Sequence, residues 1–216
     1  MDDRESMTQE QNVFLANRNV AEYVFNYAKL EGCNITLAET QMILHGENVG
    51  HISLRDIQRI LNLSGAWNYM LASFGSEFNL DYLCKINLYV FRNENLEGGK
   101  IRTKKARPFP GTNYTPELPV KEHVEADIDR LLAIESVTES AIKLFLWLYK
   151  SQLFLDGNRR AGLICANRRL IEAGKGILTI RHTNIKEFAR LLSQYCDTGD
   201  DTIIQWIFDN CIVGLD

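Results

Sequence analysis

The sequence predicts an all-α fold of roughly nine helices, because helix-start signals recur along the chain and apolar residues follow them at helical spacing. No segment keeps the alternation of apolar and polar residues that marks a half-buried strand, so a core built on a sheet is disfavoured. Of the 216 residues, 45% are hydrophobic, which is usual for a globular domain with one large core.

Four residue pairs have the spacing of a helix cap, in which a polar side chain accepts a hydrogen bond from the backbone three residues later. They are Thr36 with Glu39, Ser53 with Asp56, Ser136 with Glu139, and Asn184 with Glu187. Each pair predicts the beginning of a helix. Apolar residues at spacings of three and four then predict helical bodies. They do so over residues 13–27, 54–64, 141–149 and 201–212.

Residues 97–121 break this pattern, because they hold all four prolines of the chain and three of its glycines. Proline removes the backbone donor that a helix needs, so the segment cannot be helical. Long irregular loops in compact domains usually carry a function or move. We therefore expect a long ordered excursion between two helical halves, with a plain surface linker as the alternative.

The most distinctive stretch is Gln-Leu-Phe-Leu-Asp-Gly-Asn-Arg-Arg at residues 152–160. One helical run ends before it near Lys150, and another follows it and stops at Gly174. Asp-Gly-Asn is a turn signal, and Asn158 is a candidate cap for the second helix. We expect a helix–loop–helix whose loop opens a helix N-terminus.

A helix N-terminus offers free N–H groups and the positive end of a dipole, which suits a phosphate. Arg159 and Arg160 in the first turn oppose the usual charge preference, and an anion bound between them and the backbone would offset that cost. Asp156 is a hard oxygen ligand suited to Mg²⁺ that phosphates also hold. On residue chemistry alone, a surface turn with solvated charges is an equal alternative.

Composition excludes several classes of protein. The net charge of −4 argues against a protein that coats nucleic acid, and no run of ~18 apolar residues predicts a membrane span. The polar, acidic first residues predict neither a signal nor a transit peptide. The five cysteines form no Cys-x-x-Cys pair and the four histidines lack zinc-ligand spacing, so we expect reduced thiols, a cytoplasmic location and no zinc site.

Phe-x-Asp-Gly-Asn-Arg-Arg ahead of a helix resembles the signature loop of the Fic family. That signature reads His-Pro-Phe-x-Asp/Glu-Gly-Asn-Gly-Arg-x-x-Arg, and many members have Lys for the last Gly. The resemblance implies an all-α Fic fold with a β-hairpin flap. Most characterised members transfer AMP from ATP to a hydroxyl of a target protein, and the related Doc toxins move a phosphoryl group instead.

Two further regions extend the resemblance. Gly-Lys-Ile-Arg at residues 99–102 and the irregular chain after it are similar to the flap region, here 97–121. Residues 31–40, Glu-Gly-Cys-Asn-Ile-Thr-Leu-Ala-Glu-Thr, are similar to the motif of an N-terminal autoinhibitory helix, with Tyr27 and Cys33 in place of the usual Ser/Thr and Asn. We expect one Fic-type domain over 1–216, with an inhibitory region at 1–50 and a degenerate loop at 152–163.

Carried over by position, the resemblance implies a site for ATP and Mg²⁺. Asp156 would bind the metal ion, and four residues would hold the phosphates, namely Gly157, Asn158, Arg159 and Arg160. Phe154 would anchor the loop in the core. Glu31 would reach toward the phosphate site and block productive ATP binding.

The flap would contact the target protein, through residues that include Pro110, Gly111, Thr112 and Asn113. The resemblance thus implies a protein target and ATP as partners. A homodimer and a separate antitoxin partner both remain open, although an inhibitory motif within the chain makes a separate inhibitor less necessary. We expect neither a nucleic acid nor a membrane as a partner.

Three positions depart from the family pattern. Gln152 replaces the histidine that acts as general base, and an amide cannot serve as one. Leu153 replaces the proline, which is a mild change. Leu163 replaces the second arginine, which in the family holds the γ-phosphate and pairs with the inhibitory glutamate. Glu31 then lacks that partner unless Arg159 substitutes for it.

Three functional interpretations follow, and we favour the first. The chain is a protein adenylyltransferase whose activity is weak or conditional, with Gln152 only orienting the target hydroxyl. The second is a catalytically inactive Fic module that binds a nucleotide or a protein. The third is a Doc-like phosphotransferase, suggested by the basic Arg159, although that route also uses the histidine that Gln152 replaces.

Overall fold

A computed structural model describes residues 1–94, 96–109 and 112–215, and this part of the chain is all-α as predicted. It contains ten α-helices and one short 3₁₀ turn, His182–Asn184. The helices are α1 (Gln9–Arg18), α2 (Val20–Leu30), α3 (Leu37–Leu44), α4 (Leu54–Ala72), α5 (Leu80–Val90), α6 (Lys121–Leu132), α7 (Val137–Ser151), α8 (Asn158–Glu172), α9 (Ile185–Thr198) and α10 (Thr202–Cys211). None of the described helices has the length and apolar character that a lipid bilayer crossing requires.

The single helix expected over residues 13–27 is two helices, α1 and α2, which explains the tenth helix. Asn19 separates them with φ −113° and ψ 16°, outside the helical region. Its carbonyl still accepts hydrogen bonds from the backbone N–H groups of Glu22 and Tyr23. The apolar spacing therefore continues across the break, so periodicity alone could not reveal it.

Three of the four expected caps are present. The side chains of Thr36, Ser53 and Ser136 each accept a hydrogen bond from the backbone N–H three residues later. The expectation for Asn184 is wrong. Its side chain makes no cap hydrogen bond, because Asn184 closes the 3₁₀ turn that leads into α9 and donates its own N–H to the carbonyl of Arg181.

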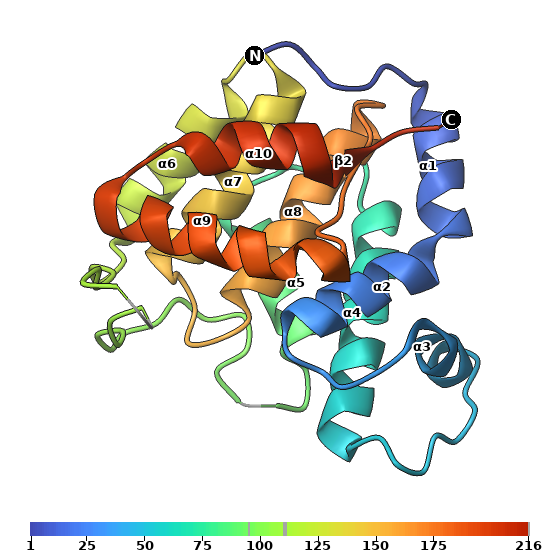
Figure 1. The fold of residues 1–216 in the computed structure, drawn as a ribbon. Coiled ribbons are helices and arrows are strands. Elements are labelled where there is room, and N and C mark those ends of the chain that lie inside the picture. The colour runs from blue at the N-terminus through green and yellow to red at the C-terminus, as the bar shows by residue number, and fades with distance from the viewer. Residues whose placement is uncertain (95, 110–111, 216) are drawn as a thin grey trace.

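The core lies around α8, which packs against α1, α4, α5 and α7 (Figure 1). Most of its side chains are buried, so the helix has no broad polar face. Gly162 lets α7 approach closely, since a Cβ at this position would lie 3.1 Å from a ring carbon of Phe145 and 3.2 Å from its carbonyl oxygen. Burial on all sides fixes the position of the N-terminus of α8.

The described residues contain a single two-stranded sheet. Strand β1 (Ile177–Leu178), directly after α8, pairs antiparallel with β2 (Ile212–Val213), directly after α10. This pairing ties the end of the chain to the central helix.

The predicted flap region, 97–121, begins against the signature loop. Ile101 makes an isolated antiparallel bridge with Phe154. Further along, the backbone N–H of Phe109 donates to the carbonyl of Tyr114, and the described residues of this region pair with one another in no strand. Of the four flap residues named from sequence, Pro110 and Gly111 lie outside the described residues. The other two are Thr112 and Asn113, and the Asn113 N–H donates to an Asp197 carboxylate oxygen at 2.8 Å.

Candidate functional site

The loop between α7 and α8 is bounded by two residues in the left-handed region. Gln152 follows the last residue of α7 with φ 46°, a conformation uncommon for a side chain larger than glycine. Gly157 ends the loop with φ 77° and is the residue from which α8 starts. Both turns are needed to reverse the chain between two closely packed helices.

The Asn158 side chain holds this loop together, and the prediction that it caps α8 is wrong. Its Oδ1 accepts from the Phe154 N–H at 2.8 Å, and its Nδ2 donates to the Phe154 carbonyl at 2.9 Å. Because the loop turns at Gly157, Asn158 is already the first residue of α8 and its amide points back into the loop. Phe154 itself is 1% exposed, which confirms that it anchors the loop in the core.

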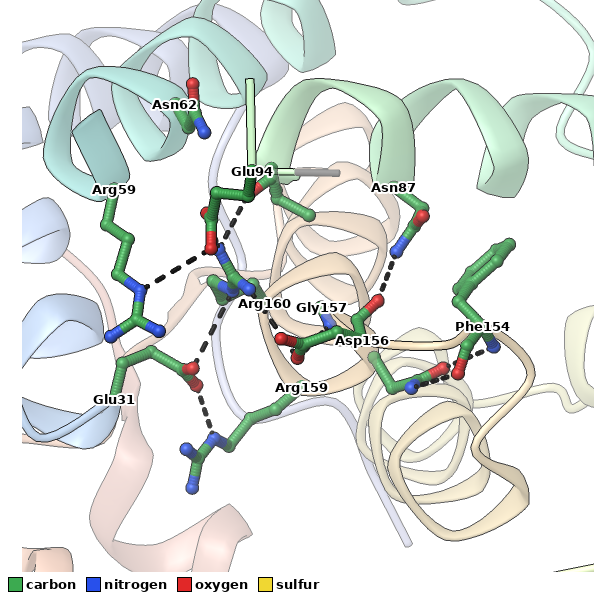
Figure 2. Close-up of polar contacts among 12 residues, drawn as sticks. Glu31, Arg59, Asn62, Asn87, Glu94, Phe154, Asp156, Gly157, Arg159 and Arg160 are labelled. Atoms are coloured by element: carbon green, nitrogen blue, oxygen red, sulfur yellow. Dashed lines mark hydrogen bonds and ion pairs between the residues drawn. The ribbon is translucent and has the colours of Figure 1, made fainter. Parts of the chain in front are cut away.

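Asn87 on α5 joins the loop to the start of the flap region. Its Nδ2 donates to the Asp156 carbonyl at 2.9 Å (Figure 2). Its Oδ1 accepts from the Gly99 N–H at 2.8 Å. Gly157 lies against the same side chain, since a Cβ there would be 3.0 Å from Asn87 Nδ2 and 3.2 Å from a methyl carbon of Val90. The loop can approach α5 this closely only with glycine at position 157.

We therefore expect Gly157→Ala to destabilise the protein by about 1–3 kcal/mol, from backbone strain and from displacement of Asn87. Gly199→Ala is the matched control, because Gly199 has nearly the same φ, 76°, but no atom within 4 Å of the added Cβ. Urea unfolding of both variants would measure the difference. Equal losses of stability would show that the close approach of Gly157 to α5 contributes nothing.

Arg102 fixes the first half of the loop from the flap side. It is 7% exposed, its backbone N–H donates to the Leu153 carbonyl at 3.0 Å, and its guanidinium donates to the Gln152 and Glu117 carbonyls. Burial lowers the pKa of Arg102 below its usual value. The Arg102 guanidinium thus donates to backbone carbonyls and not to a carboxylate. These hydrogen bonds hold Gln152 in its left-handed conformation.

The Glu31 carboxylate reaches the N-terminus of α8 and lies between two arginines (Figure 2). Its Oε1 accepts from Arg159 Nε at 2.6 Å, and its Oε2 is 3.6 Å from Arg160 Nε. The Glu31 side chain is only 12% exposed. Burial alone would lower the pKa of Arg159, but the negative charge of Glu31 and its hydrogen bond raise that pKa above its usual value.

A second carboxylate braces Arg160 from the other side. Glu94, just beyond α5, accepts from Arg160 Nη1 at 2.7 Å, and its other oxygen lies 3.7 Å from Arg59 Nε on α4. Arg160 is 1% exposed and also donates to the Val90 carbonyl at 2.6 Å. Sequence reasoning missed Glu94, Arg59 and Asn87, because none is part of a local motif and only tertiary folding brings them to the loop.

The site still has unused donors that suit an anion. Among the described residues, Arg160 Nε and Nη2 are buried without a hydrogen-bond partner, although Glu31 and the Asp156 carboxylate are each 3.6 Å away. Buried donors without a partner are costly, and a phosphate oxygen could satisfy them. The donor set thus fits the phosphates of ATP.

The residues present suit Mg²⁺ only when phosphates supply further ligands. The Asp156 side chain is 51% exposed, and one of its oxygens already accepts from the Gly157 N–H at 2.5 Å. No group of three His, Cys, Asp or Glu side chains in the described part of the chain could hold a metal ion. Mg²⁺ commonly binds through one carboxylate together with substrate phosphates, and Asp156 suits that arrangement.

Two clefts meet at Gln152 and Tyr149, which line both of them. The smaller, about 160 Å³, is lined also by Glu31, Asp156 and Arg159, and the larger, about 710 Å³, opens toward the flap region. The Gln152 side chain donates to the Tyr149 carbonyl at 2.7 Å and accepts from Asn158 Nδ2 at 3.2 Å. Burial raises the pKa of the Tyr149 phenol, so it is protonated at neutral pH.

Comparison with solved structures identifies the fold. The chain matches Fic-1 from C. elegans with a TM-score of 0.76 at 21% identity, over 88% of this chain and 59% of that one. It matches a Fic domain containing signaling protein from Bacteroides thetaiotaomicron with a TM-score of 0.74 at 16% identity, over 95% and 86%. It also matches the BepC protein of Bartonella tribocorum, solved with bound AMPPNP, with a TM-score of 0.56 at 17% identity, over 72% and 84%.

No protein-family model and no curated protein matches the sequence. This chain spans about three fifths of the length of the C. elegans chain that it resembles. At these identities the likeness concerns the fold alone. The described part of this chain has the fold of Fic domain proteins.

Proposed function

We propose that this protein binds ATP and Mg²⁺ at the N-terminus of α8 and transfers AMP to a protein hydroxyl with weak or conditional activity. The observation that carries the proposal is the Glu31 carboxylate held by Arg159 and Arg160. A helix N-terminus with two arginines is an anion site, and here a carboxylate of the same chain is the anion. The bound AMPPNP of BepC, which has the same fold, supports a nucleotide phosphate as the competing anion.

The residues of the site have distinct roles in this proposal. Arg160 and the first N–H groups of α8 would bind phosphate oxygens, and Asp156 would be the protein ligand of Mg²⁺. The metal ion, when bound, neutralises phosphate charge. Glu31 limits ATP binding by occupying Arg159, so that activity depends on moving α2 or on removing the carboxylate.

The missing group is a general base. In AMP transfer the target hydroxyl oxygen bonds to the α-phosphorus, the bond to the pyrophosphate oxygen breaks, and the hydroxyl proton must leave. Gln152 cannot accept that proton, the Tyr149 phenol is protonated, and no histidine lines either cleft among the described residues. The proton passes to water, which makes the reaction slow.

A second candidate function is a non-catalytic module that binds a nucleotide or a protein. It is favoured by the Gln152 amide, whose donor and acceptor are engaged by Tyr149 on α7 and Asn158 on α8, as expected of a structural side chain. A Doc-like phosphoryl transfer is the third. It differs from AMP transfer in which phosphorus is attacked, so the position of a radioactive label separates the two.

The test is incubation of the Glu31→Gly variant with Mg²⁺ and ATP labelled at the α- or the γ-phosphate, with a lysate as the source of targets. We expect protein-bound label from α-labelled ATP and not from γ-labelled ATP. Label from the γ-phosphate alone would establish phosphoryl transfer instead. ATP binding in calorimetry without any protein-bound label, even after Gln152→His, would leave the non-catalytic module as the function.

A further inference from the structure

The larger cleft, on the flap side of Gln152, has a basic rim. Its lining includes Arg102, Lys104, Lys105 and Arg107, all from one short segment, and no acidic residue. The Lys104, Lys105 and Arg107 side chains are exposed, and none makes an ion pair within the part of the chain that the structure describes. Three unpaired cations at one cleft stand out in a chain with a net charge of −4.

The floor of the cleft is apolar. Phe154 is buried beneath it, Phe109 packs on Tyr149 with ring centroids 5.2 Å apart, and Leu155 is exposed at its edge. Arg102 adds no free charge, because its guanidinium is engaged by backbone carbonyls of the loop and the flap region. An apolar floor below separate positive side chains suits a segment that carries apolar or backbone groups as well as negative charges.

The position of the cleft connects it to the anion site. Tyr149 and Gln152 line both the 710 Å³ cleft and the 160 Å³ cleft, which is also lined by Glu31 and Arg159. A molecule bound in the basic cleft would therefore contact the same two side chains that border the proposed phosphate site. A hydroxyl group of that molecule, lying next to Gln152, would be close to the site of the proposed AMP transfer. The basic rim would then select what lies on either side of that hydroxyl.

We propose that this cleft binds an acidic polypeptide segment, with carboxylates on the rim formed by Lys104, Lys105 and Arg107 and the acceptor hydroxyl next to Gln152. The proposal names the class of protein target and in that respect rests on the proposed function. A polypeptide fits better than a nucleic acid, because three rim cations and a net charge of −4 give little of the extended positive surface that a phosphate backbone needs.

The experiment measures peptide binding without ATP. The probe is a short fluorescein-labelled peptide with glutamates on both sides of one serine, and the comparison peptide has glutamine for each glutamate. Fluorescence anisotropy is recorded for the wild type, for Lys104→Gln/Lys105→Gln/Arg107→Gln, and for the control Arg55→Gln/Lys85→Gln/Lys186→Gln. The control removes the same charge from exposed positions on α4, α5 and α9. Thermal unfolding verifies that all three proteins are folded.

We expect the acidic peptide to bind the wild type and the control alike and the rim variant about tenfold more weakly, with affinity falling as salt rises. Equal binding of the glutamine peptide, equal binding by the rim variant, or no binding of the acidic peptide would overturn the proposal. Displacement of the peptide by a short single-stranded oligonucleotide at lower concentration than by unlabelled peptide would replace it with a nucleic-acid site. Because ATP is absent, a failure of AMP transfer would leave this result standing.

Discussion

Glu31→Gly is expected to raise the affinity for ATP by about tenfold or more. In the wild type the phosphates must displace a carboxylate that Arg159 holds at 2.6 Å and that lies 3.6 Å from Arg160. A charge-assisted hydrogen bond contributes about 1.5–3 kcal/mol, and 1.4 kcal/mol corresponds to a factor of ten. Removing the carboxylate also leaves Arg159 without the ion-pair partner that it has here, which adds to its attraction for a phosphate. Calorimetric titration with Mg²⁺ and ATP measures the change.

Two matched variants separate the charge of Glu31 from its shape and from the general loss of an acidic group. Glu31→Gln keeps the size of the side chain at the end of α2, so it should raise the affinity nearly as much as Glu31→Gly. Glu22→Gln removes an exposed carboxylate from the same helix and should change nothing. If Glu31→Gly binds ATP no more tightly than the wild type, Glu31 does not compete with the nucleotide.

Gln152→His in the Glu31→Gly background is expected to raise the rate of AMP transfer by about 10²–10⁴, the usual contribution of a positioned general base. Position 152 suits this role, because Arg102 fixes its backbone and the side chain lies in the wall between the two clefts. An imidazole there could accept the hydroxyl proton that glutamine cannot. The rate of label transfer from α-labelled ATP is the measurement.

Gln205→His, at an exposed position on α10, is the control for the introduction of a histidine elsewhere. It should leave the rate unchanged. Activity that is the same with glutamine and histidine at position 152 would mean that proton removal does not limit the reaction. Loss of the Gln152 contacts to Tyr149 and Asn158 should lower stability only slightly, since Phe154 still anchors the loop.

The helical class and the three helix starts capped by Thr36, Ser53 and Ser136 could be predicted, because a cap is a local interaction between residues three apart. The break at Asn19 could not be predicted, because the apolar spacing is continuous across it. The backbone dihedral angles of Asn19, which interrupt the helix, do not change the pattern of apolar residues. Asn158 shows a similar limit. Its sequence context is equally compatible with a cap and with a bond inside the loop, and the left-handed turn at Gly157 decides between them.

Only part of the candidate site could be predicted from the sequence. The consecutive residues 152–160 revealed the loop, and the family resemblance pointed to Glu31. The resemblance also left Arg159 as the residue that could substitute for the arginine absent at position 163. The pairing of Glu31 with Arg159 agrees with that substitution. Glu94, which braces Arg160, lies just beyond α5, and Arg59, which pairs with Glu94, lies on α4. Neither follows a motif, so only the folded chain identifies them.

The central claim is that the Glu31 carboxylate and the phosphates of ATP compete for one anion site at the N-terminus of α8. A crystal structure of the Glu31→Gly variant with ATP and Mg²⁺ tests it most directly. The account predicts phosphate oxygens at the first N–H groups of α8 and within hydrogen-bond distance of Arg160 Nε or Nη2, with Mg²⁺ against Asp156. ATP bound elsewhere, or no nucleotide at this helix end at saturating concentration, would contradict it.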